Sequence, residues 1–206
     1  VTGVQTCALP ISGADRRWRA VSTYADRIHD AAFAPDGQLY VVSHASAPHG
    51  KVLRTSPDAP SLARGTEIYR ATEGNIQQVA VTPTQLVVSG IIGGPSSLRT
   101  IDLRTGQVRD VAIPSVSSVS QLVSAGDDIL FVQERYVEPP SWHRLARDGS
   151  VQPTPLAGRP VAAFGDVVVS RGEAVSKDGT RVPVTVLHRQ GVSRDGARPT
   201  ILYGYG

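Results

Sequence analysis

The chain has 206 residues, of which 40% are apolar, enough for one large or two modest domains with a sizeable core. Its formal charge is only +3, and the basic residues are scattered along the chain, so we expect no nucleic-acid-binding surface. No apolar run approaches the length of a membrane-spanning helix, and we therefore expect no membrane span.

The first eleven residues, VTGVQTCALPI, resemble the translated sequence of a common sequencing adapter. We therefore interpret residues 1–11 as non-native and expect them to have no fixed structure. They contain Cys7, the only cysteine, so the rest of the chain is predicted to form no disulfide bond. We expect a fragment of a longer protein, and a cytoplasmic or a periplasmic location stays open because a signal peptide would lie upstream.

Short strands separated by turns are predicted from about residue 28 onward. Residues 31–43, AAFAPDGQLYVVS, place apolar runs on both sides of Asp36-Gly37, a hairpin signal because glycine accepts the positive φ of such turns. Similar turns are predicted at Thr105-Gly106, Gly126-Asp127 and Asp148-Gly149. No stretch beyond ten residues has a convincing helical period, so the fold class is mainly β.

The predicted hairpins recur along the chain. Their second strands begin at Leu39, Leu86 and Ile129, at intervals of 47 and 43 residues. Four short strands in each unit of about 40–50 residues is the spacing of β-propeller blades. We predict a partial β-propeller with three four-stranded blades at 28–72, 76–113 and 118–157, and a β-sandwich is the alternative. Because three blades cannot close a ring, this pattern also indicates a fragment.

Residues that could carry chemistry form no complete site in this sequence. Only His44 and His49, among five histidines, have a spacing near that of a metal motif, and their loop offers no third ligand. We expect solvated or backbone-bonded imidazoles there, and no metal or cofactor. Asp127, Asp128 and Asp148 fall in turns, where their carboxylates are expected to accept hydrogen bonds from local amides. No G-x-S-x-G nucleophile motif occurs.

Residues 173–206, EAVSKDGTRVPVTVLHRQGVSRDGARPTILYGYG, resemble the start of the peptidase domain in the prolyl oligopeptidase family of serine peptidases. The similarity lies in the turn at 176–180, the strand that follows it and the closing Tyr-Gly-Tyr-Gly. A weaker similarity to the family's propeller extends upstream to about residue 28. We accordingly expect a partial propeller over 12–163 and the first strands of a truncated α/β-hydrolase peptidase domain over 164–206.

The resemblance implies that the propeller caps the peptidase domain and restricts access to short peptides. Opening strands are expected at 168–176 and 180–189, followed by a buried strand that contains Ile201 and Leu202. The Ser-His-Asp triad would lie after residue 206, so we expect the fragment itself to be inactive. The intact enzyme is expected to be a monomer that cleaves short peptides after proline. Two alternatives stay open: cleavage after Lys or Arg, as in the oligopeptidase B branch, and a non-catalytic propeller that binds a ligand or partner.

One catalytic residue is implied by the resemblance. The second tyrosine of the family's Tyr-Gly-Tyr-Gly motif, here Tyr205, would donate its hydroxyl hydrogen to the oxyanion of the tetrahedral intermediate. A phenol stays protonated at neutral pH and is able to donate. Gly204 and Gly206 would let the substrate approach the backbone, whereas Tyr203 is expected to be a packing residue. A structural tyrosine at a strand end is the alternative for Tyr205.

Overall fold

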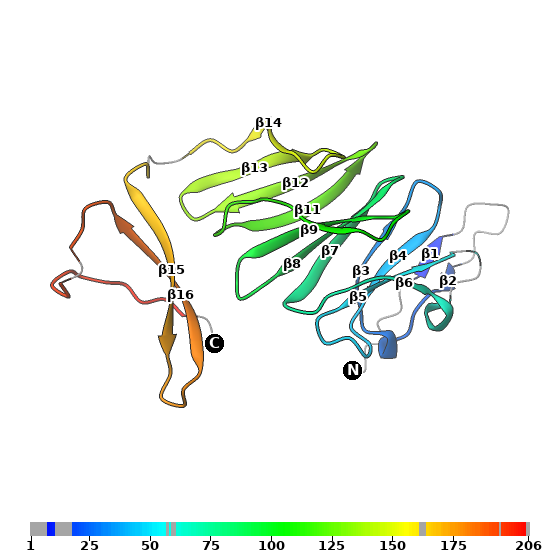
Figure 1. The fold of residues 1–206 in the computed structure, drawn as a ribbon, viewed down its shortest axis with the longest axis horizontal. Coiled ribbons are helices and arrows are strands. Elements are labelled where there is room, and N and C mark those ends of the chain that lie inside the picture. The colour runs from blue at the N-terminus through cyan, green and yellow to red at the C-terminus, as the bar shows by residue number, and fades with distance from the viewer. Residues whose placement is uncertain are drawn as a thin grey trace. The chain divides into compact units, whose positions relative to one another are not determined.

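The computed structural model describes residues 8–10, 18–56, 58, 61–160, 164–193 and 195–204. The chain divides into two compact units, residues 1–160 and 161–206. The first unit contains three four-stranded sheets and one pair of short strands, and the second contains a two-stranded sheet (Figure 1).

Each four-stranded sheet is made of strands that follow one another in the chain and pair antiparallel in that order. The first blade comprises β3 (Ile28–Phe33), β4 (Leu39–Ser43), β5 (Lys51–Thr55) and β6 (Thr66–Arg70); the second comprises β7 (Asn75–Val81), β8 (Gln85–Ile91), β9 (Ser96–Asp102) and β10 (Val108–Asp110); the third comprises β11 (Ser118–Ala125), β12 (Asp128–Arg135), β13 (Glu138–Leu145) and β14 (Val151–Ala157). The three predicted four-stranded units are confirmed. Three successive meanders also differ from the two facing sheets of a β-sandwich.

Local turn chemistry explains where the strands stop. In the β3–β4 turn, Gly37 has a φ of +81°, which residues with a Cβ rarely adopt. Asp36 Oδ1 accepts a hydrogen bond from the Gln38 amide at 3.0 Å, and this side-chain contact stabilises the turn. These contacts involve neighbouring residues only, and a sequence pattern can therefore reveal the turn.

The apolar core lies between adjacent blades rather than within one. Leu86 and Val88 of β8 belong to a buried cluster that also contains Tyr40 and Val52 of the first blade. Val87, between them, belongs to a second cluster that contains third-blade residues such as Phe131. The second blade is therefore buried on both faces, which explains the nearly continuous apolar run of β8. Burial of each large side chain contributes roughly 1.5–3 kcal/mol.

The first strands of successive blades lie side by side, β3 next to β7 and β7 next to β11. Two side chains link these strands. Asp30 on β3 accepts a hydrogen bond from the Val79 amide at 2.8 Å, and the Ser124 hydroxyl on β11 donates to the Val81 carbonyl at 2.8 Å. The blades are thus held together by polar contacts at their first strands as well as by the apolar clusters.

Before the first blade, β1 (Ala8–Pro10) pairs antiparallel with β2 (Trp18–Ala20). The expectation that residues 1–11 have no fixed structure is therefore wrong for Ala8–Pro10. Backbone pairing needs only another extended segment, and an adapter-like sequence supplies the same backbone donors and acceptors as a native one. The other residues of that segment lie outside the described part of the chain.

Helical structure in the described residues is confined to two 3₁₀ turns, η1 (Tyr24–Asp26) and η2 (Leu62–Arg64). This agrees with the sequence, which predicts no long helix. No helix in the described ranges is long and apolar enough to cross a membrane.

The second unit contains a long hairpin of β15 (Val167–Val175) and β16 (Arg181–Arg189). The predicted strands at 168–176 and 180–189 are confirmed to within one residue. Their connection is a tight turn in which the Gly179 amide donates to the Ser176 carbonyl at 2.9 Å. The start of an α/β-hydrolase sheet, expected for residues 164–206, remains a prediction because this hairpin is the only sheet among the unit's described residues.

The expected buried strand at Ile201 and Leu202 is wrong. Neither residue is in a strand, and their exposed fractions are 95% and 91%. A strand is stabilised by backbone hydrogen bonds to a neighbour and by packing of at least one face. No described residue pairs with 201–204, so the apolar sequence alone does not form a strand there.

Candidate functional site

The tyrosine for which the sequence implies a catalytic role, Tyr205, lies outside the described residues, as does Gly206. Tyr203 and Gly204, which precede it, are described and have no regular secondary structure. Tyr203 is 85% exposed, so its expected role in packing is wrong for this chain. Like Ile201 and Leu202, Tyr203 pairs with no strand among the described residues. The role of Tyr205 as an oxyanion donor stays a prediction.

The two closely spaced histidines occupy the β4–β5 loop, and each has a ring nitrogen near a backbone carbonyl, as expected for backbone-bonded imidazoles. Nδ1 of His49 lies 2.6 Å from the Gly74 carbonyl, and Nδ1 of His44 lies 3.4 Å from the Pro48 carbonyl. The His44 ring also meets His29 edge-on, with ring centroids 5.9 Å apart. No group of three possible metal ligands occurs in the described part of the chain.

The turn carboxylates have mainly structural contacts. Asp148 accepts a hydrogen bond from the Ser150 amide at 2.9 Å, as predicted, and hydrogen bonds from Ser150 lower the pKa of Asp148. Asp128 differs from its prediction, because it begins β12 and accepts a hydrogen bond from Arg144 Nε at 2.6 Å. The turn pattern did not indicate this contact with an arginine on the neighbouring strand.

Among the described residues, a guanidinium at the boundary of the first two blades has several hydrogen-bond partners. Arg99 on β9 donates to Asp110 at 2.7 Å, to Glu73 at 2.9 Å and to the Tyr69 hydroxyl at 3.1 Å. The hydrogen bond to Asp110, followed by that to Tyr69, raises the pKa of Arg99, which stays charged. Because all three nitrogens are engaged, Arg99 joins the two blades rather than offering a free binding group.

The first strand of every blade contains a β-bulge, which sequence reasoning missed. The pairing register shifts between Ile28 and Asp30, between Ile76 and Gln78, and between Ser120 and Val123. The bulged residues include His29, Gln77 and Gln121, the last with a φ of +54°. A bulge changes the direction of a side chain and is common next to functional sites. The available sequence signal was a polar residue that interrupts the two-residue alternation.

These bulges lie on the three first strands, which are neighbours in space. His29 and Gln121 are exposed and Gln77 is half-buried, so each first strand carries a hydrogen-bonding side chain at its bulge. Such groups are suited to bind an extended peptide backbone. On their own they include no nucleophile with an adjacent base, and they are therefore suited to binding rather than to covalent chemistry.

Comparison with known families identifies the blades. A family model described as the N-terminal β-propeller domain of prolyl oligopeptidase matches residues 17–151, more than half of the chain. The chain belongs to the prolyl oligopeptidase family. Its three meanders are therefore blades of that family's propeller, and the sandwich alternative is excluded.

Relatives within the family are much longer than this chain. An uncharacterized peptidase, y4nA, of Sinorhizobium fredii (strain NBRC 101917 / NGR234) is 36% identical over 132 residues, which cover 61% of this chain and 18% of that protein. The prolyl endopeptidase of Elizabethkingia meningoseptica is 20% identical over 172 residues, which cover 82% of this chain and 24% of the relative. The chain thus spans about a fifth to a quarter of the length of these relatives.

A solved structure has the same fold. Oligopeptidase B from Trypanosoma brucei, in a closed form with covalently bound antipain, superposes with a TM-score of 0.72 at 19% identity. The match covers 93% of this chain and 29% of that one. At this identity the likeness shows the fold alone.

Proposed function

We propose that this chain is part of a serine peptidase that cleaves short peptides after proline. The observation that carries the proposal is the family match over residues 17–151, joined in one chain to the β15–β16 hairpin and the Tyr-Gly-Tyr-Gly motif. Residues 12–163 belong to the propeller, and residues 164–206 open the α/β-hydrolase peptidase domain. The Ser-His-Asp triad is supplied by a part of the protein outside these residues, and the enzyme acts as a monomer.

The blades contribute selection of the substrate rather than chemistry. The bulges on the first strands carry the polar side chains His29, Gln77 and Gln121, which offer hydrogen-bond donors and acceptors to the backbone of a peptide. An unfolded peptide exposes such backbone groups, whereas a folded protein has most of them paired. This difference supports short, flexible peptides as the substrates.

The proposed role of Tyr205 follows from the chemistry of acyl transfer. When the nucleophile attacks the carbonyl, negative charge develops on the oxygen, and a hydroxyl aimed at that position stabilises the transition state. A phenol is a suitable donor because it is protonated at neutral pH. Loss of one such donor costs roughly 2.7–4 kcal/mol of transition-state stabilisation.

Cleavage after lysine or arginine is the second candidate. It stays a candidate because the Tyr-Gly-Tyr-Gly motif does not separate the two specificities. Reporter peptides with proline or arginine before the scissile bond, presented to the full-length enzyme, distinguish the candidates by their kcat/KM values.

The chain of 206 residues is expected to have no peptidase activity by itself, because an oxyanion donor without a nucleophile has no intermediate to stabilise. Purified chain should release no dye from either reporter and should not react with a fluorophosphonate probe. The full-length protein should do both. Labelling of a serine within residues 1–206 would contradict the proposal, and an inactive full-length protein would favour a non-catalytic propeller.

In the full-length enzyme, Tyr205→Phe is expected to lower kcat by roughly two to three orders of magnitude on an amide substrate, because it removes only the donating hydroxyl. The free energy of unfolding should change by less than about 1 kcal/mol, since one phenol hydroxyl contributes little net stability. Tyr203→Phe is the matched control and should leave kcat nearly unchanged. Near-normal turnover of Tyr205→Phe would show that this tyrosine is structural.

A further inference from the structure

The first blade carries a polar pocket of about 560 Å³ at the end where β5 leads into β6. Two arginines, Arg54 and Arg64, line it together with hydroxyl residues that include Thr55, Ser61 and Thr66. Cationic groups and hydroxyls thus converge on one space, and the interblade apolar clusters do not include any of these residues.

The strand register explains why these side chains meet. Arg54 on β5 is paired directly with Thr66 on β6, so both side chains lie on the same face of the sheet. The segment between the strands ends in the 3₁₀ turn η2, which places Arg64 beside Ser61, with Nε 3.4 Å from the serine hydroxyl. The Ser61 amide donates to Thr55 Oγ1 at 3.3 Å, which holds Ser61 next to the end of β5.

The positive charges of Arg54 and Arg64 are not neutralised by a carboxylate in an ion pair among the described residues. Within the described residues neither Arg54 nor Arg64 forms an ion pair, in contrast to Arg70, Arg99 and Arg144. Each guanidinium has five N–H donors in a planar fork, the geometry that matches phosphate and carboxylate oxygens. A hydrogen bond links Arg54 to the Tyr40 hydroxyl, and Arg64 Nε bonds to Ser61. The remaining N–H donors of the two guanidinium groups are available to an anion.

The nearly buried hydroxyl adds a further donor. Thr55 is only 8% exposed, and its oxygen already accepts from the Ser61 amide, which leaves its proton to donate. One carboxylate, Asp36, also lines the pocket, but its Oδ1 accepts from the Gln38 amide in its own turn. Two cations against one anion give the lining a net positive charge.

We propose that this pocket binds a phosphate-class oxyanion between the guanidinium groups of Arg54 and Arg64, with the Thr55 hydroxyl as a third donor. A tetrahedral oxyanion has more acceptor oxygens than a carboxylate and makes fuller use of two guanidinium forks and several hydroxyls. The ligand is either free inorganic phosphate or a phosphomonoester on a larger molecule. The site is independent of the peptidase activity.

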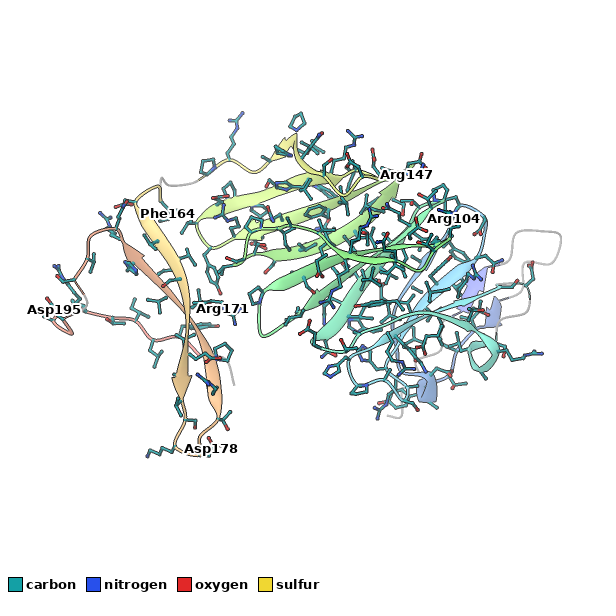
Figure 2. The ribbon with its side chains drawn as sticks, in the orientation of Figure 1. Arg104, Arg147, Phe164, Arg171, Asp178 and Asp195 are labelled. Atoms are coloured by element: carbon teal, nitrogen blue, oxygen red, sulfur yellow. The ribbon has the colours of Figure 1, made fainter. Side chains whose placement is uncertain are left out.

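The test is calorimetric titration of the 206-residue chain with inorganic phosphate at constant ionic strength and pH 7.5. Sulfate should bind with similar affinity and acetate at least tenfold more weakly. Arg54→Gln and Arg64→Gln should each weaken phosphate binding about tenfold or more, because each removes charge-assisted hydrogen bonds. Arg147→Gln is the matched control, since Arg147 is an exposed arginine in the β13–β14 turn (Figure 2) and should leave the affinity within twofold.

Two further arms make the outcome decisive. Asp36→Asn should strengthen phosphate binding severalfold, because it removes the one negative charge in the lining. O-phosphoserine is compared with phosphate: tighter binding of the ester identifies a phosphomonoester ligand, and tighter binding of phosphate identifies the free ion. Equal affinities for the parent chain, both arginine variants and the Arg147 control would overturn the proposal, as would acetate binding as well as phosphate.

Discussion

The blades and the β15–β16 hairpin are built from the same two-residue alternation, but they differ completely in burial. Phe131 on β12 has no exposed surface, whereas Val186 on β16 is 42% exposed. None of the described residues of the second unit is buried. Alternation therefore predicts a strand, while burial depends on a second face that packs against it.

One face of the hairpin is mainly apolar, although it also includes Ser170, Gly172 and His188. Val168, Ala174, Val182 and Val186 occupy positions on one face, since each pairs across the hairpin with a residue of the same alternate set. In the blades, comparable faces meet the next sheet and form the two interblade clusters. The difference lies in the presence of a neighbouring sheet, not in the strand sequence.

The largest effect expected from this difference is on stability. Phe131→Ala should lower the free energy of unfolding by about 3–5 kcal/mol, because it leaves a cavity between the second and third blades. Val186→Ala in the hairpin should cost less than about 1 kcal/mol, since its side chain is already partly in water. Urea unfolding of the two variants measures both values. Equal losses would mean that the hairpin face is packed in solution.

A smaller effect is expected from two arginines that form ion pairs. Arg99→Met should destabilise the first unit by about 1–2 kcal/mol, because the Arg99 side chain is 18% exposed and its loss leaves polar partners at the blade boundary. Arg181→Met in the hairpin is the matched change: Arg181 is 73% exposed, its partner Glu173 is 52% exposed, and the cost should stay below about 0.5 kcal/mol. Salt should weaken the Arg181–Glu173 pair more than the ion pairs of Arg99.

The smallest expected effect concerns two turn carboxylates that should behave alike. The Thr105 amide lowers the pKa of Asp102 in the second blade, and the Thr180 amide lowers the pKa of Asp178 at the hairpin tip (Figure 2). Because each folded-state pKa lies below the unfolded value, each stabilises the fold at neutral pH. This contribution is lost as pH falls through the folded pKa.

Carboxyl-carbon NMR titration measures both of these pKa values directly. Both should lie below that of an aspartate in the urea-unfolded chain. An Asp178 that titrates at the unfolded value while Asp102 does not would show that the hairpin turn is absent in solution.

Sequence reasoning located the blades because turns are local. The amide of Gln38 and the carboxylate of Asp36 are two residues apart, so the signal for the β3–β4 turn is contained in the sequence itself. Arg99 on β9 contacts Tyr69 on β6, Glu73 between β6 and β7, and Asp110 on β10. No local sequence pattern indicates these contacts. Register shifts such as the one at Gln121 depend on how two strands pair, which the alternation of one strand does not determine.

The candidate site was predicted less completely than the fold. The Tyr-Gly-Tyr-Gly resemblance indicated a function, but burial of Ile201 and Leu202 was inferred from apolar character alone and was wrong. The pocket around Arg54 and Arg64 was not predicted, because the two arginines converge only through the β5–β6 register and the turn that follows.

The order of strands within each sheet has a consequence for synthesis on the ribosome. Every blade is complete once its own four consecutive strands have emerged, so its backbone pairing involves short loops and little entropy of closure. Its apolar face, however, stays exposed until the next blade has been translated, roughly a few seconds later at 5–20 residues per second. During that interval the nascent first blade exposes the Tyr40 and Val52 surface to chaperones, and translation speed through the second blade sets how long that exposure lasts.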